Sequence, residues 1–222
     1  MKLEGYADIS GQITCLTGLR IGGSKESVGL GETDNPIIRH PVSRLPYIPG
    51  SSLKGKLRSL LEMKYSSHSQ QTGEPCNCGE CPICALFGCG DPRRSKEPTR
   101  LIFRDALMSE KTREELEEAL PGSYAEVKTE IRMDRKEGKA ASGALRTQER
   151  LPEGSIFDLS ISMRLFEEDT PEKRKEYMEK LADAFNDLEK DYLGGSGTRG
   201  YGKVKVAHGD QSMGDYLRSL KL

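Results

Sequence analysis

The sequence contains no long apolar run, only three histidines and no tryptophan. A membrane-spanning helix needs about 20 consecutive apolar residues, and the first ten residues lack the apolar stretch of a signal peptide. We therefore expect a soluble, cytoplasmic protein with no membrane partner. The histidines stand far apart in the chain, at positions 40, 68 and 208. Acid–base catalysis by a histidine pair thus has no evident candidates.

The composition is that of a globular chain with an uneven charge distribution. Hydrophobic residues make up 35% of the 222 residues, and the 24 glycines bring the apolar share to the roughly 45–50% of ordinary folded proteins. The net charge of −1 conceals a basic stretch from Arg39 to Lys64, in which one acid faces six lysines and arginines. Residues 167–191 carry ten acids against five bases. Charge runs usually mark solvated faces, but a basic patch also suits a polyanion.

Hydrophobic periodicity predicts alternating strands and helices. The clearest signal is in residues 155–165, where apolar and polar residues alternate as in a half-buried strand. Apolar residues of the segment after Thr170-Pro171 recur at helical spacing, from Tyr177 to Tyr192. The other predicted elements are strands over 6–17, 101–107, 124–132 and 203–207, helices over 51–65, from Thr112 to Pro121 and over 213–222, and an extended loop from 18 to about 49.

This order predicts an α+β fold. Without its insertions the chain reads strand, helix, strand, strand, helix, strand, which is the βαββαβ arrangement of ferredoxin-like domains. We expect one domain over 1–222, with a palm formed by residues 1–65, 101–107 and 151–210. Residues 66–100 form one insertion and residues 108–150 a second.

Five of the six cysteines lie between residues 76 and 89. Thiolates three residues apart reach one side of a turn and can surround a tetrahedral ion, which favours a closed structural zinc site. The preferred ligand set is His68 with Cys78, Cys81 and Cys84, and Cys76 is a substitute. A disulfide fits a reducing cytoplasm poorly, and an iron–sulfur cluster is a second alternative. Two cysteines are expected to pack rather than bind metal: Cys15 and Cys89.

The segment from Pro49 to Tyr65 predicts a basic helix that begins with a serine cap. Ser51 and Ser52 stand at its start, where backbone amides and the helix dipole favour an anion. Lys54 and Arg58 are four residues apart and share a helix face. These groups predict a phosphate-binding surface, although a capped helix with solvated lysines explains the same residues.

Two loops add candidate residues. The segment 194–202 holds five glycines with Arg199 and Tyr201, so backbone can approach a ligand while arginine holds phosphate and tyrosine stacks. It lacks the GxxxxGK[ST] pattern of a P-loop. Asp34 precedes Asn35-Pro36 in the loop before the basic helix, a context that is ordinarily a turn.

Three stretches together resemble a known family. They are the segment Leu16–Gly23, the run from Asp34 through Pro49-Gly50-Ser51-Ser52-Leu53-Lys54-Gly55-Lys56-Leu57-Arg58, and the glycine loop. With Ala141–Arg146 they resemble the RAMP superfamily of CRISPR proteins, most closely the repeated backbone subunit of type III-A (Csm) effector complexes. The likeness covers nearly the whole chain.

The resemblance implies an RRM-like palm, a zinc-bearing lid and a β-hairpin thumb over Val127–Arg150. It also implies copies stacked as a filament along a CRISPR RNA, beside other subunits of the complex. In the family an aspartate before the basic helix is needed to cut target RNA at regular intervals, and here it matches Asp34. The implied RNA contacts are Arg20, Ser51, Ser52, Lys54, Lys56, Arg58, Arg132 and Arg199.

One departure bears on the mechanism, because relatives often carry histidine where this chain has Arg20. A phosphate contact by Arg20 remains natural. Asp34 orients or deprotonates the attacking 2′-hydroxyl, or holds a divalent cation such as Mg²⁺, and the sequence does not separate these roles. The alternatives are a non-catalytic RNA-binding scaffold and a stand-alone ribonuclease that matures CRISPR transcripts.

Overall fold

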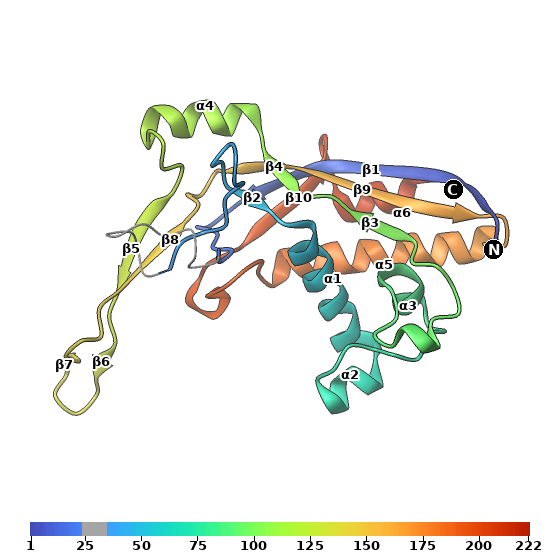
Figure 1. The fold of residues 1–222 in the computed structure, drawn as a ribbon, viewed down its shortest axis with the longest axis horizontal. Helices are drawn as coiled ribbons and strands as arrows, with labels where there is room; N and C mark the ends of the chain where they lie inside the picture. The colour runs from blue at the N-terminus through green and yellow to red at the C-terminus, as the bar shows by residue number, and fades with distance from the viewer. Residues whose placement is uncertain (24–34) are drawn as a thin grey trace.

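The computed structural model describes residues 1–23 and 35–222, and in these residues seven strands form one sheet (Figure 1). The order of its main path is β11-β10-β1-β9-β4-β2, and β3 also pairs with β9. Its strands are β1 (Leu3–Cys15), β2 (Tyr47–Ile48), β3 (Leu101–Phe103), β4 (Ala106–Met108), β9 (Ile156–Phe166), β10 (Val204–His208) and β11 (Gln211–Ser212).

The core of this sheet confirms the ferredoxin-like prediction. Strand β10 pairs with β1, β1 with β9, and β9 with both β3 and β4, all antiparallel. Counting β3 and β4 as one interrupted strand, the order is 4-1-3-2, as in a split βαβ fold. The long β1–β9 pair, from Leu3 opposite Phe166 to Thr14 opposite Ile156, forms the centre.

Helices α1 (Gly50–Tyr65), α5 (Pro171–Lys190) and α6 (Met213–Ser219) cover one face of the sheet (Figure 1). The alternation in β9 is as predicted, because Phe157, Leu159, Ile161 and Met163 are buried. Each such side chain contributes about 1.5–3 kcal/mol of transfer free energy. The predicted stripe of α5 is buried from Tyr177 to Leu188. Tyr192 lies beyond the end of the helix at Lys190.

The single strand predicted over 101–107 is wrong, because the structure has two short strands there. Phe103 pairs with Ile161 and Leu107 with Asp158. The chain therefore advances four residues from β3 to β4 while β9 advances only three. The extra residue falls at Arg104-Asp105 and interrupts the ladder as a bulge does. The loop predicted from 18 to about 49 also contains β2, which pairs with β4.

The first insertion connects α1 to β3 through two short helices and a 3-10 turn. These are α2 (Ser67–Thr72), α3 (Pro82–Phe87) and η2 (Pro92–Arg94). Leu86 and Phe87 belong to the main hydrophobic core. The Phe87 ring stacks on Phe103 of β3, with centroids 5.9 Å apart. The insertion is therefore packed against the palm.

The second insertion begins with helix α4 (Glu110–Ala119) and continues as a hairpin that extends away from the sheet (Figure 1). Its strands are β5 (Glu126–Glu130), β6 (Met133–Asp134), β7 (Lys139–Ala140) and β8 (Arg146–Arg150). β5 pairs with β8 and β6 with β7. The helix predicted from Thr112 begins earlier, at Glu110, because Ser109, directly after β4, caps it by accepting a hydrogen bond from the Thr112 amide.

No helix in residues 1–23 and 35–222 combines the length and the apolar character that a membrane crossing requires.

Candidate nucleic-acid interface and metal centre

Helix α1 begins at Gly50, and its first amides are bonded by protein groups rather than by a serine side chain. The Gly50 amide donates to Asp105 Oδ1 at 2.8 Å. The amides of Ser52 and Leu53 donate to the carbonyl of Pro49, at 2.9 and 3.2 Å. The predicted serine cap is therefore wrong, because both serines lie inside the first turn. The signal that sequence reasoning missed is Asp105, which is distant in the chain.

Gly50 fits tightly into the interruption between β3 and β4. A Cβ atom at this position would lie 2.9 Å from the carbonyl oxygens of Phe103 and Arg104. Such a contact is closer than carbon and oxygen tolerate, so only glycine lets the helix start this near the strands. The bulge at Arg104-Asp105 thus sets where the basic helix begins.

The predicted phosphate-binding residues of α1 differ in their partners. Ser51 is exposed and Ser52 half-buried. Lys54 follows Ser51 by three residues and shares its face. Partial burial and the nearby charge of Arg58 lower the pKa of Lys54. Among the described residues Lys54 has no ion-pair partner, which leaves its charge available to a ligand.

Lys56 and Arg58 are already paired within the protein. Lys56 Nζ lies 2.7 Å from Asp191 Oδ2 and 4.0 Å from the centre of the Tyr192 ring. Arg58 Nε donates to Glu62 Oε1 at 2.8 Å. Exposed ion pairs contribute little, but pairs this well shielded hold their geometry.

The glycine loop packs against the segment around Arg20 and against Tyr192, whose ring lies under Lys56 of α1. A Cβ on Gly197 would overlap the Tyr192 ring, at 1.9 Å from its nearest atom. The Gly195 amide donates to the Arg20 carbonyl at 2.8 Å. A Cβ on Gly195 would lie 3.4 Å from Arg20 Nη1. The fold thus brings the Arg20 segment, the glycine loop and α1 together.

Glu130 at the end of β5 connects this loop to the hairpin. Arg199 Nη1 donates to Glu130 Oε2 at 3.0 Å, and Tyr201 Oη donates to Glu130 Oε1 at 2.9 Å. The Tyr201 ring is buried and lies under the cations of Lys128 and Arg150. The prediction that Tyr201 stacks on a ligand is therefore wrong, because the hairpin covers its ring.

Arg132 and Arg199 line one pocket at the base of the hairpin. Its volume is about 270 Å³, and Arg146 is a third cation on its wall. Sequence reasoning named the Ala141–Arg146 motif but missed Arg146 as a candidate contact. Three arginines in one hollow suit phosphate groups, because guanidinium binds phosphate with two parallel hydrogen bonds. Glu130, which also lines the pocket, offsets part of their charge.

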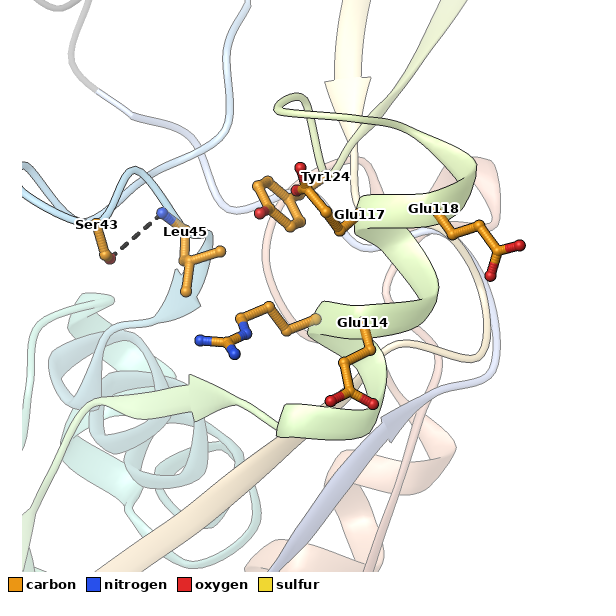
Figure 2. A pocket seen from close by; sticks show the side chains of 7 residues that line it. Ser43, Leu45, Glu114, Glu117, Glu118 and Tyr124 are labelled. Atoms are coloured by element: carbon orange, nitrogen blue, oxygen red, sulfur yellow. Dashed lines mark hydrogen bonds between the residues drawn. The ribbon is translucent and has the colours of Figure 1, made fainter.

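A second pocket, between α4 and the segment 43–45, has the opposite character (Figure 2). Glu114, Glu117 and Glu118 line it together with Tyr124, whose hydrogen bond with Glu117 raises the pKa of its phenol. Among the described residues that line it, Arg113 is the one cation, and it is paired with Glu110. This acidic pocket disfavours a polyanion.

Asp34 lies outside the described residues, but hydrogen bonds define the position of the next residue, Asn35. Arg20 Nη2 donates to Asn35 Oδ1 at 3.4 Å. The Glu149 amide donates to the Asn35 carbonyl at 3.1 Å, so Asn35 is held against β8. The Nε atom of Arg20 is buried without a hydrogen-bond partner among the described residues.

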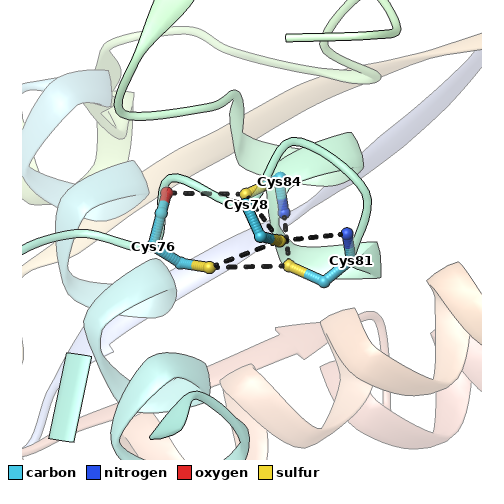
Figure 3. A group of neighbouring side chains, drawn as sticks. All are labelled: Cys76, Cys78, Cys81 and Cys84. Carbon is cyan, nitrogen blue, oxygen red and sulfur yellow. Dashed lines mark hydrogen bonds between the residues drawn. The ribbon is translucent and has the colours of Figure 1, made fainter. Parts of the chain in front are cut away.

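The cysteine knuckle, defined here as residues 76–84, gathers four sulfur atoms (Figure 3). The Sγ atoms of Cys76, Cys78, Cys81 and Cys84 all lie within 4.8 Å of one another. Sulfur ligands 2.3 Å from one ion would lie about 3.8 Å apart in a tetrahedron. The distances are 3.6 Å from Cys76 to Cys78, 3.8 Å from Cys76 to Cys81 and 3.9 Å from Cys78 to Cys84. The four cysteines therefore fit a tetrahedral metal ion.

This set includes Cys76, which sequence reasoning held only as a substitute. The side chain of His68 lies outside the described part of the structure. Cys89 is not in the cluster, and Cys15 is a core residue of β1, as expected. Burial raises the pKa of Cys15 to about 12, so this thiol stays protonated.

The thiols of the knuckle have unequal pKa values. Burial raises the pKa of Cys81 to about 11. Burial also acts on Cys78, but hydrogen bonds from the Glu80 and Cys81 amides outweigh it and lower its pKa to about 7. Amides aimed at a sulfur favour the thiolate, which is the form that binds metal.

Comparisons with known proteins agree with this architecture. Residues 12–205 match the RAMP superfamily. The CRISPR system Cms endoribonuclease Csm3 of Methanocaldococcus jannaschii is 42% identical over 209 residues, covering 92% of this chain and 80% of that protein. The corresponding Csm3 of Methanothermobacter thermautotrophicus is 41% identical over 244 residues, covering 97% and 96%.

A solved structure shows the same relationship in three dimensions. In the crystal structure of a Csm3–Csm4 subcomplex of the type III-A CRISPR-Cas interference complex, the matching chain is 32% identical. The match has a TM-score of 0.58 and covers 93% of this chain and 77% of that one. The chain therefore belongs to the RAMP superfamily and, within it, to the Csm3 family.

Proposed function

We propose that this chain is the backbone subunit of a type III-A CRISPR interference complex, where it binds CRISPR RNA and cleaves complementary target RNA at regular intervals. The observation that carries this is the near full-length relationship to proteins named Csm3 endoribonucleases, at 41–42% identity. The proposal includes target RNA, further copies of the chain in a filament and other type III-A subunits as partners. It also includes a cytoplasmic location.

The guide strand runs along the start of α1 and the base of the hairpin in this proposal. Ser51, which is exposed, and Lys54, which is half-buried, support it because they share one face of α1 and Lys54 has no ion pair among the described residues. The pocket with Arg132, Arg146 and Arg199 supports a second group of phosphate contacts. The remaining contacts in the proposal are Arg20, Ser52, Lys56 and Arg58.

The hairpin from Val127 to Arg150 acts as a thumb that interrupts guide–target pairing. Apolar side chains along it are exposed, among them Val127, Ile131, Met133 and Leu145. Exposed apolar groups of this size can stack on or wedge between bases. In this proposal residues 66–100 form the lid, and residues 1–65, 101–107 and 151–210 form the palm.

The knuckle holds a structural zinc ion in this proposal. Four thiolates leave no open position on a tetrahedral ion, so the metal organises the insertion and does not act on RNA. Thiolates suit zinc and are poor ligands for Mg²⁺, which prefers oxygen. A divalent cation required for cleavage would therefore be separate from the knuckle.

Asp34 supplies the carboxylate for target cleavage. A carboxylate near the reacting strand can orient or deprotonate the 2′-hydroxyl that attacks the adjacent phosphate. Asn35, the residue after Asp34, supports this assignment, because it contacts Arg20 and strand β8 of the hairpin.

The test uses the assembled complex with its guide RNA. Asp34→Ala should abolish cleavage of a complementary target while guide binding and subunit composition stay as in the parent. Glu32→Gln, which removes a charge two residues away, is the matched control and should cleave normally. Cleavage that persists in Asp34→Ala would contradict the assignment and favour a scaffold that only binds RNA. Cleavage in the presence and absence of EDTA measures the need for a divalent cation.

A further inference from the structure

Two oppositely charged residues of α1 pair on the side of the helix that faces the knuckle. Arg58 and Glu62 are one turn apart, and Arg58 Nε donates to Glu62 Oε1 at 2.8 Å. Their side chains are only 15% and 8% exposed. A carboxylate this well buried is costly unless all its bonds are satisfied. The other hydrogen bonds of Arg58 and Glu62 show which part of the protein this pair holds in place.

Both partners bond to the backbone of Cys76, the first cysteine of the knuckle. Arg58 Nη2 donates to the Cys76 carbonyl at 2.9 Å. The Cys76 amide donates to Glu62 Oε1 at 2.8 Å. Two side chains of a single helix therefore fix the two peptide groups that flank the Cys76 Cα. Because these hydrogen bonds involve charged groups, they are strong, and we call Arg58 and Glu62 together the clamp.

Cys76 needs such support more than Cys81 and Cys84 do. Cys81 caps α3 with its sulfur, and Cys84 lies within that helix. Cys76 precedes α3 in irregular chain and must be brought to them from outside. Its own backbone bond within the insertion, from the Gly90 amide, is longer, at 3.2 Å. The clamp from α1 thus sets the position of the fourth sulfur.

We propose that Arg58 and Glu62 are positioning residues for the four-cysteine metal centre, and that through Cys76 they join this centre to helix α1. The inference rests on the proposed metal centre. Residues that orient ligands typically change metal affinity by about 10–100-fold when they are replaced. The Nε and Nη2 atoms of Arg58 then hold Glu62 and Cys76 in position, while the charge of Arg58 still contributes to the basic face of α1.

The test measures Zn²⁺ affinity of the full chain by competition with a chromophoric chelator, and the absorption spectrum after Co²⁺ substitution. Arg58→Lys keeps the charge but loses the fork that reaches both partners, and Glu62→Gln weakens the clamp. We expect each to bind one metal ion with about 10–100-fold lower affinity and faster release to the chelator.

Glu179→Gln is the matched control, because Glu179 also pairs with a cation one turn away, Lys175, on the exposed face of α5. It should bind metal as the parent does. Parental affinity and spectrum in both Arg58→Lys and Glu62→Gln would overturn the inference. A parent chain that binds no Zn²⁺ would instead overturn the metal centre itself, which is a distinct result.

A folding defect is separated from a positioning defect by a double variant. Arg58→Met with Glu62→Leu replaces the buried pair with apolar groups of similar size, a change that buried ion pairs often tolerate. Thermal unfolding checks that this variant folds. We expect its metal affinity to remain low, and affinity restored to the parental value would overturn the inference.

Discussion

Lys56 of α1 and Asp191, the residue after α5, form an ion pair with 2.7 Å between Nζ and Oδ2. The Lys56 side chain is 19% exposed and its charge also lies over the Tyr192 ring. Asp191 is 135 positions further along the chain. A lysine that the sequence places among phosphate contacts thus connects two helices of the palm.

This pairing predicts that Lys54 and Lys56 contribute unequally to guide RNA binding. Each phosphate contact that releases counterions adds about 1 to the slope of log K against log salt. Lys54→Ala should lower the slope by about that amount, whereas Lys56→Ala should change it less and lower thermal stability instead. Binding isotherms at several salt concentrations measure this. Equal loss of slope in the two variants would show that the Asp191 pair opens when RNA binds.

Gly50 and Gly55 of α1 should respond to alanine in opposite directions. A Cβ at Gly50 meets the carbonyl oxygens of Phe103 and Arg104, and the overpacking should cost about 1–3 kcal/mol. A Cβ at Gly55 meets nothing within 4 Å, so Gly55→Ala should stabilise the helix by about 0.5–1 kcal/mol. Urea unfolding measures both free energies. An unchanged free energy of unfolding in Gly50→Ala would mean that the bulge at Arg104-Asp105 shifts to make room for the Cβ atom.

The buried pair of Arg100 and Asp169 predicts loss of stability in acid. Two bonds, of 2.8 and 3.1 Å, join side chains that are fully buried. Burial opposes the charge on Asp169, but the bonds from Arg100 outweigh it and hold the pKa below the ordinary 3.8. Because the folded state then binds the proton less readily than the unfolded chain, stability is present above about pH 4 and falls as the pH drops below it.

Asp169→Asn removes the buried carboxylate of the pair and leaves the Arg100 charge with Glu97 alone, 2.7 Å from Nη2, so it should cost up to about 3–5 kcal/mol at neutral pH. The variant should also lose part of the acid dependence. Unfolding free energies measured from pH 7 to pH 3 check both points, and parental stability of the variant at pH 7 would argue against the pair.

Metal content should distinguish Cys76 from Cys89. Cys76→Ser removes one of the four clustered sulfurs and should abolish zinc binding or lower the zinc affinity strongly. Cys89→Ser changes a cysteine outside the cluster and should keep one zinc per chain. Elemental analysis after gel filtration measures both. Full zinc in Cys76→Ser would return His68 to the ligand set.

Local patterns predicted much of the fold because they depend on near neighbours. The alternation from Phe157 to Met163 specifies one buried face of a strand wherever that strand lies. The helical stripe from Tyr177 to Leu188 and the cysteine spacing of the knuckle are local in the same sense. Errors arose where a distant group intervened, as when Asp105 took the place of a serine cap.

The sequence by itself determined the βαββαβ core, the buried faces of β9 and α5 and a thiol cluster able to hold metal. It did not determine which charges are free. Tertiary structure decided that Lys56 pairs with Asp191, that the hairpin covers Tyr201, and that Arg58 and Glu62 hold Cys76. Periodicity acts over a few residues, whereas these contacts exist only after packing has brought distant segments together and excluded water from them.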